Sequence, residues 1–177
     1  GKIYIRDSLS QTFCTFDDIA PFFARSYILF TDEADAAIMN ASHEKYRVYL
    51  ESLSPDSLSD LTSYVADDIH FKDPFNDVRG LDAMARVFQH MFENVQNIRF
   101  NVQDMLAEDQ LCFMAWHFEG EINGNLWALK GTSVIRFAED GRVEEHIDHW
   151  DAGRDFYERL PFIGWLIAYL RRRLSAH

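Results

Sequence analysis

Apolar residues recur at helical spacing in three segments of the chain. Over residues 43–53 they lie three or four positions apart, and after a turn at residues 54–56 the same spacing resumes over residues 57–65. Gly80 then precedes a third periodic segment, residues 81–95, with an apolar stripe along one side. The pattern therefore predicts three amphipathic helices in this part of the chain.

After residue 97 the period changes to two, which is typical of half-buried strands. The alternating segments are residues 98–102, 111–118, 126–137 and 143–150, and a shorter one precedes them at residues 69–73, where Pro74 ends it. Helices followed by a run of antiparallel strands predict an α+β domain with helices on one face of a curved sheet.

Two flanking segments differ in texture from this domain, which is expected to span residues 43–152. Residues 1–42 form an aromatic-rich N-terminal extension, and residues 153–177 form a helical tail. Residues 162–174 of the tail would form a helix that is apolar on nearly every side, with three consecutive arginines, Arg171 to Arg173, near its end. Such a helix is expected to be buried on this protein's own sheet or on a sister subunit, with a membrane surface as the alternative.

The composition narrows the class of protein. With 47% apolar residues the chain can form a core, and its net charge of −12 argues against nucleic-acid binding, which needs a basic surface. The longest apolar run, residues 162–170, is too short to span a bilayer. Cys14 and Cys112 have apolar neighbours and are expected to be buried free thiols, which predicts a soluble, cytoplasmic protein.

The candidate chemistry lies on the predicted strands. His146 and Asp148 are two positions apart, so they share a strand face with Glu144 and Trp150, while Val143 and Ile147 lie on the opposite face. A carboxylate beside an imidazole can orient it for proton transfer. The alternative from the residues alone is that this polar face is turned to water, and a metal site built on the same pair is a second, weaker alternative.

Two longer segments resemble known proteins. Tyr49 followed by Val65-Ala66-Asp67-Asp68-Ile69-His70-Phe71-Lys72-Asp73-Pro74-Phe75, and the later segment from residue 127 through 137 to 150, resemble ketosteroid isomerases of the nuclear transport factor two-like superfamily. The closing Val143-Glu144-Glu145-His146-Ile147-Asp148-His149-Trp150-Asp151 also resembles the SnoaL-like polyketide cyclase branch. The resemblance covers roughly residues 44–152.

The resemblance implies a cone-shaped, cystatin-like fold with a deep apolar pocket, and homodimers that form across the outer face of the sheet. It places the isomerase base at Asp73 and the hydrogen-bond donor to the enolate at Tyr49, 24 positions earlier. Ser133 stands where the isomerases have a second, acidic donor, and Asp148 lies near the acid/base residue of the cyclases. The expected pocket lining, which would bind substrate, is Phe88, Met114, Trp116, Phe118 and Trp150, together with Ser133.

These observations predict a cofactor-independent acid/base enzyme of isomerase, cyclase, dehydratase or epoxide hydrolase type, acting on a small apolar molecule. Its expected catalytic residues are Tyr49, Asp73, His146 and Asp148, converging on one hollow. The alternative is a non-catalytic module of the same fold that binds a small ligand or assembles as a dimer. In that case Asp73 caps a turn and Tyr49 is a core aromatic residue.

Overall fold

The computed structural model describes residues 39–176, and residues 40–176 belong to one compact unit. Of the predicted N-terminal extension only residues 39–42 are described, and they begin the first helix. The elements in chain order are a helix over residues 39–51, η1 (Leu58–Ser63), β1 (Val65–Lys72), β2 (Asp77–Arg79), α2 (Leu81–Asn94), β3 (Gln96–Glu108), β4 (Leu111–Ile122), β5 (Asn125–Phe137), β6 (Val143–Trp150), α3 (Ala152–Asp155), η2 (Tyr157–Arg159) and α4 (Gly164–Leu174).

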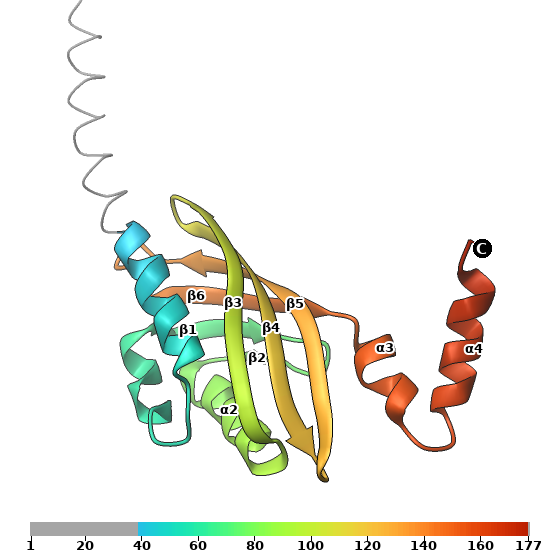
Figure 1. Ribbon diagram of the computed structural model, residues 1–177. Coiled ribbons are helices and arrows are strands. Elements are labelled where there is room, and N and C mark those ends of the chain that lie inside the picture. Colours follow the sequence, from blue (N-terminus) through green and yellow to red (C-terminus); the bar gives the residue numbers. More distant parts are fainter. Residues whose placement is uncertain (1–38, 177) are drawn as a thin grey trace, which may run out of the picture. The chain divides into compact units, whose positions relative to one another are not determined.

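The strands of the described residues form one six-stranded sheet in the order β2-β1-β6-β5-β4-β3. Every neighbouring pair is antiparallel except β1 and β6, which are parallel. The long strands β3, β4 and β5 curve strongly, as Figure 1 shows. This arrangement confirms the predicted α+β fold with a curved sheet, whereas the short strand β2 was not predicted from the sequence.

The helix over residues 39–51 and α2 pack on one face of this sheet. α2 buries Met84 and Phe88, and the ring of Phe88 meets that of Phe71 on β1 edge to face, with centroids 5.5 Å apart. The segment expected as a second helix over residues 57–65 is the shorter 3-10 helix η1, because β1 already begins at Val65. Burial of the apolar stripe on α2 against the sheet closes one side of the molecular core.

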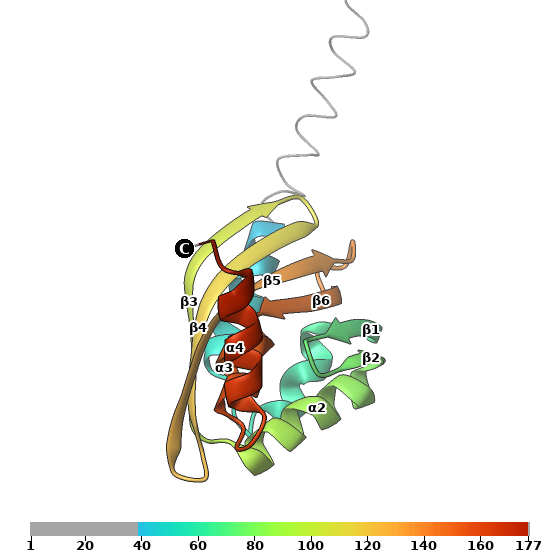
Figure 2. The same ribbon diagram turned by 90° about the vertical axis from the view of Figure 1, so that its right-hand side faces the viewer.

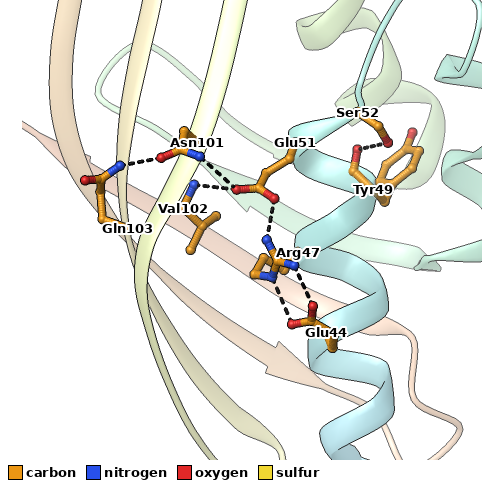
Figure 3. Close-up of polar contacts among 8 residues, drawn as sticks. All are labelled: Glu44, Arg47, Tyr49, Glu51, Ser52, Asn101, Val102 and Gln103. Atoms are coloured by element: carbon orange, nitrogen blue, oxygen red, sulfur yellow. Dashed lines mark hydrogen bonds and ion pairs between the residues drawn. The ribbon is translucent and has the colours of Figure 1, made fainter.

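A chain of polar contacts fixes the helix over residues 39–51 to β3 (Figure 3). Arg47 binds the carboxylates of Glu44 and Glu51. Glu51 in turn accepts a hydrogen bond of 2.8 Å from the backbone N–H of Val102. Glu51 therefore satisfies a backbone donor of the outermost strand, and this contact sets the height of the helix on the sheet.

A bulge in β6 overturns the expected orientation of Val143. Phe137 pairs with Val143 and the preceding Arg136 pairs with Glu145, so Glu144 is the extra residue. A bulge shifts the alternation by one position. Val143 is consequently fully buried on the inner side, like His146, and does not contribute to the outer face as its spacing from Ile147 predicted.

The tail helix is not buried on the protein's own sheet, and its burial on a sister subunit stays a prediction. α4 packs on η2, where Arg171 binds the carboxylate of Glu158 and Gly164 lies against the Glu158 backbone. In Figures 1 and 2, α4 follows α3 at the end of the sheet. Phe162 is 91% exposed and Trp165 is 69% exposed, so within residues 39–176 no second surface covers this helix. None of the described helices is long and apolar enough to cross a bilayer.

His43 is a buried histidine without hydrogen bonds. Its side chain is fully enclosed, its ring meets that of Phe137 edge to face at 4.6 Å, and neither ring nitrogen has a partner. Burial disfavours the imidazolium and lowers the pKa of His43 in the folded chain from 6.5, and this effect outweighs the opposing effect of the Asp109 backbone. As the pH falls below that value, the unfolded chain takes up a proton before the folded chain does.

We therefore expect His43 to make the free energy of unfolding fall as the pH drops below about 6.5, and to have no such effect above it. His43→Leu removes this contribution, and its pH slope should be shallower by up to about 1.4 kcal/mol per pH unit, the limit for one proton. Urea unfolding of both proteins between about pH 8 and about pH 5 measures the difference. Parallel curves for wild type and variant would contradict the expectation.

Candidate functional site

A cavity of about 840 Å³ opens between the sheet and the helices, within the size range of small-molecule sites. Its walls come from α2, from strands β1, β3, β4, β5 and β6, and from the segment around α3 and η2. Most of the lining is aromatic or aliphatic. Among the predicted site residues, the lining includes Asp73, Phe88, Trp116, Phe118, His146, Asp148 and Trp150.

Strand register places the inner side chains in rows across the sheet. On β5, Ile135 pairs with His146 and Ser133 pairs with Asp148. On the other side of β6, Phe71 of the parallel strand β1 also pairs with His146. Directly paired residues point to the same face. The predicted sharing of one face by His146, Asp148 and Trp150 is therefore confirmed, and this face is the one that lines the cavity.

Gly131 leaves space in this wall for a tryptophan. A Cβ on Gly131 would lie 2.4 Å from the ring of Trp116 and 2.9 Å from the backbone oxygen of His149. The indole ring thus lies flat across the glycine. In this position Trp116 Nε1–H reaches Ser133 and donates a hydrogen bond of 2.8 Å to its Oγ.

The hydrogen bonds around Asp148 all run toward one of its oxygens. Ser133 Oγ accepts from Trp116, so its own proton is free to be donated to Asp148 Oδ1, 2.5 Å away. His146 Nε2 lies 2.9 Å from the same Oδ1, and a carboxylate only accepts, so Nε2 carries the proton. Oδ2 has no hydrogen-bond partner among residues 39–176, and it is the oxygen left for the cavity.

Tyr46 completes the arrangement from the helix over residues 39–51. Its hydroxyl lies 2.8 Å from His146 Nδ1, and in the tautomer that carries its proton on Nε2 alone, Nδ1 accepts and Tyr46 is the donor. Burial, followed by the negative charge of Asp148, raises the pKa of Tyr46 well above its usual value. Tyr46 therefore stays protonated, and the sequence Tyr46 to His146 to Asp148 holds with both ring nitrogens of His146 hydrogen-bonded.

The environment of each group separates Asp148 from His146. His146 is 3% exposed, with edge-to-face contacts to Tyr46 and Phe71, and both of its nitrogens are occupied. The Asp148 side chain is 19% exposed and lines the cavity. Asp148 is consequently the group that can meet a ligand, and His146 is the group that orients it.

Asp73 lines the same cavity, but its carboxylate is engaged in a turn. Oδ1 accepts from the backbone N–H groups of Phe75, at 2.7 Å, and Asn76, at 2.6 Å, and the Asn76 amide binds both oxygens at 3.0 Å. This is the turn-capping arrangement that an Asp before Pro commonly adopts. The structure thus places Asp73 at the cavity with Oδ1 accepting three hydrogen bonds and Oδ2 accepting one from the Asn76 amide.

Tyr49 does not join the other predicted catalytic residues. Its ring stacks on that of Tyr64 with centroids 4.0 Å apart, and its hydroxyl donates a long hydrogen bond of 3.3 Å to the Ser57 carbonyl. Tyr49 is not part of the cavity lining. The expected convergence of four side chains on one hollow is therefore correct for His146 and Asp148, holds for Asp73 by position only, and is wrong for Tyr49.

Two of the expected lining residues stand behind the wall instead. Met114 and Ser133 are fully buried and do not reach the cavity surface, and Ser133 acts on it only through Asp148. Tyr46 was not predicted as a site residue; it lies in the periodic segment over residues 43–53. Within the described chain, no group of three acidic, histidine or cysteine side chains is placed to hold a metal ion.

Comparison with solved structures finds many chains of the same fold. An NTF2-like protein of unknown function from Exiguobacterium sp. 255-15 aligns with a TM-score of 0.55 and 19% identity, covering 62% of this chain and 98% of its own. A Mycobacterium tuberculosis LEH-like epoxide hydrolase aligns with a TM-score of 0.57 and 17% identity, covering 80% and 96%.

A protein from Jannaschia sp. CCS1 that is named as a SnoaL-like polyketide cyclase also aligns with this chain. The TM-score is 0.57 and the identity 11%, and the alignment covers 66% of this chain and 87% of the other. At these identities the likeness shows the fold alone. No match is found among curated proteins. The SnoaL-like domain family, however, matches residues 46–146, which is more than half of the sequence. The chain belongs to the SnoaL-like domain family.

Proposed function

We propose that this protein is an acid/base enzyme that moves a proton on a small, mostly apolar organic molecule bound in the cavity, with Asp148 as the base. The observation that carries the proposal is the arrangement at Asp148. Ser133 and His146 both bind Oδ1, and this fixes the carboxylate at an apolar cavity wall with Oδ2 available. A positioned carboxylate in such a site is a usable general base.

The chemistry assigned to Asp148 is one proton transfer. Oδ2 takes a proton from a carbon next to a carbonyl group, and the electrons of the broken C–H bond pass to the carbonyl as an enolate. Return of the proton to another carbon gives isomerisation. Attack of the enolate carbon on a second carbonyl forms a carbon–carbon bond, and the resulting alkoxide takes the proton back from Asp148, which gives cyclisation. If a bound water is the proton donor instead, its oxygen attacks an epoxide carbon, the C–O bond of the ring breaks, and the resulting alkoxide takes the proton. His146 and Tyr46 serve as positioning residues.

Proton transfer to solvent tests this function without knowledge of the natural substrate. Small cyclic ketones are incubated with the protein in D₂O, and a cyclohexene oxide probe is followed for hydration. Deuterium uptake next to the carbonyl, or diol formation, in proportion to protein concentration supports the proposal. The control is Asp148→Asn, which keeps the cavity and removes the base. Binding of the probes without exchange or hydration would instead favour the non-catalytic binding module.

We also propose the homodimer that the sequence resemblance implies, formed through the outer face of the sheet. Leu106, Phe113, Val134 and Ile147 pair directly across β3, β4, β5 and β6 and form a continuous apolar row on that face. Leu106 is 74% exposed and Phe113 is 40% exposed. An apolar row of this kind on a sheet is suited to an isologous contact with a second copy.

Sedimentation velocity tests the dimer. Phe113→Asp places a charge in the centre of the row and is expected to give monomers at concentrations where the wild type dimerises. Leu126→Asp is the matched control, because Leu126 is also exposed on the sheet but lies outside the row. A Phe113→Asp protein that sediments like the wild type would contradict this interface.

A cytoplasmic location of the protein stays a prediction. Of the two cysteines in the sequence, Cys112 is buried and free, and burial raises the pKa of the Cys112 thiol to about 11.

A further inference from the structure

One wall of the cavity carries a guanidinium and an imidazole group, both on exposed residues, that nothing else in the described chain binds. On α2 the side chains of Arg86 and His90 both line the cavity, four positions apart. Residues at this spacing are neighbours on one side of a helix. Neither side chain has an ion pair or hydrogen bond with any of residues 39–176.

The other titratable groups of the lining each have a partner in the described chain. Glu51 binds Arg47 and the Val102 N–H, and Asp73 caps its turn. His146 and Asp148 bind each other on β6. Arg86 is an exposed residue that lines the cavity and has no ion pair with any described residue. Its guanidinium is available to a ligand that enters the cavity.

The same helix presents an apolar row beside this polar one. Ala83, Val87 and Met91 line the cavity at spacings of four, and so do Arg86 and His90 along the adjacent edge. A ligand lying along α2 would thus meet aliphatic carbon on one side and positive or neutral donors on the other. This pattern fits a molecule that is apolar over most of its length and ends in an anionic group.

We infer that the substrate of the proposed reaction is an apolar organic acid, whose carboxylate binds Arg86 while its apolar body extends toward Asp148. Arg binds a carboxylate through two parallel N–H groups, which fixes orientation as well as charge. The negative Asp148 repels a second carboxylate on its own side of the cavity. Attraction at α2 and repulsion at β6 therefore select one orientation of the ligand. Calling the ligand a substrate rests on the proposed function. The binding of an apolar organic acid to Arg86 does not rest on it.

Matched probes test the recognition directly. 2-Naphthoate and 2-naphthamide have the same ring system and differ in the charge of the substituent. Isothermal titration with the full chain is expected to show naphthoate binding about tenfold more tightly than naphthamide, as one charge-assisted pair at a partly exposed site allows. Arg86→Gln should remove this preference, so that the two probes bind with about equal affinity. Arg99→Gln is the matched control, because Arg99 is an exposed residue of β3 outside this cavity and its loss changes the net charge equally.

The outcomes separate this inference from the proposed function. Asp148→Asn should abolish exchange yet keep or increase the preference for naphthoate, because it removes a like charge from the cavity. A protein without exchange activity that still prefers naphthoate through Arg86 would overturn the enzyme and leave the anion site. Equal binding of the two probes to wild type, no binding of naphthoate, or a preference retained in Arg86→Gln would each overturn the anion site.

Discussion

Asp148→Asn is expected to slow deuterium exchange of a bound ketone by a factor of about 10²–10⁴, the usual contribution of a positioned general base. Asparagine keeps an oxygen that can accept from Ser133 and His146, so the wall should remain folded. What the amide lacks is a basic oxygen facing the cavity. NMR observation of the exchanging C–H signal gives the rate, and thermal unfolding shows that the fold is intact.

Asp73→Asn supplies the matched control in the same cavity. The Asp73 oxygen that caps the turn is replaced by an amide oxygen that accepts the same backbone hydrogen bonds from Phe75 and Asn76. We therefore expect the exchange rate of this variant to stay within about threefold of wild type, far from the loss that removal of a general base causes. If Asp73→Asn lost exchange and Asp148→Asn retained it, the two carboxylates would have been assigned the wrong way round.

His146→Ala is expected to lower the free energy of unfolding by about 3 kcal/mol or more. The ring is packed against Tyr46 and Phe71, and its removal leaves a cavity in the core. It also leaves the buried Tyr46 hydroxyl without a hydrogen-bond partner. Urea unfolding monitored by tryptophan fluorescence measures the loss.

His149→Ala controls for the removal of a histidine from the same strand. His149 is exposed on the outer side of β6, and its truncation should change the free energy of unfolding by no more than about 0.5 kcal/mol. Equal destabilisation by the two changes would mean that the Tyr46–His146–Asp148 arrangement does not stabilise the fold.

The pairing of His146 with Asp148 could be predicted from the sequence because strand alternation is a local property. Both residues lie after the bulge, so the spacing of two holds between them. Val143 lies before the bulge at Glu144, and its predicted orientation was wrong for that reason. Nothing in the sequence around Glu144 marks a bulge, since it is set by the register with β5 rather than by local propensity.

The choice between Tyr46 and Tyr49 could not be made from periodicity. The two residues are three positions apart, and both lie on the buried side of the helix over residues 39–51. Which of them reaches β6 depends on the rotation of this helix, which the contact between Glu51 and Val102 helps to fix. That contact joins residues 51 positions apart, beyond the reach of any local pattern. The resemblance to ketosteroid isomerases selected Tyr49 by its distance from Asp73.

The tail illustrates a different limit. A segment that is apolar nearly all round predicts burial, yet in the described chain α4 contacts η2 and leaves Trp165 exposed. Hydrophobicity indicates that a surface tends to be covered, but not by which molecule.

The role of Asp73 could not be predicted from the sequence either. A carboxylate before proline is equally compatible with a catalytic base and with a turn cap, and only its hydrogen bonds distinguish the two.

Because the Asp148 carboxylate is held in place, proton exchange on a bound ligand should be stereospecific. A carboxylate that could rotate would collect protons through either oxygen and from a range of angles. With Oδ1 bound by Ser133 and His146, only Oδ2 is free, and it approaches a bound molecule from the β6 side alone. Of the two prochiral hydrogens on a ligand methylene group, one should exchange for deuterium and the other should remain, so that the labelled product is a single enantiomer.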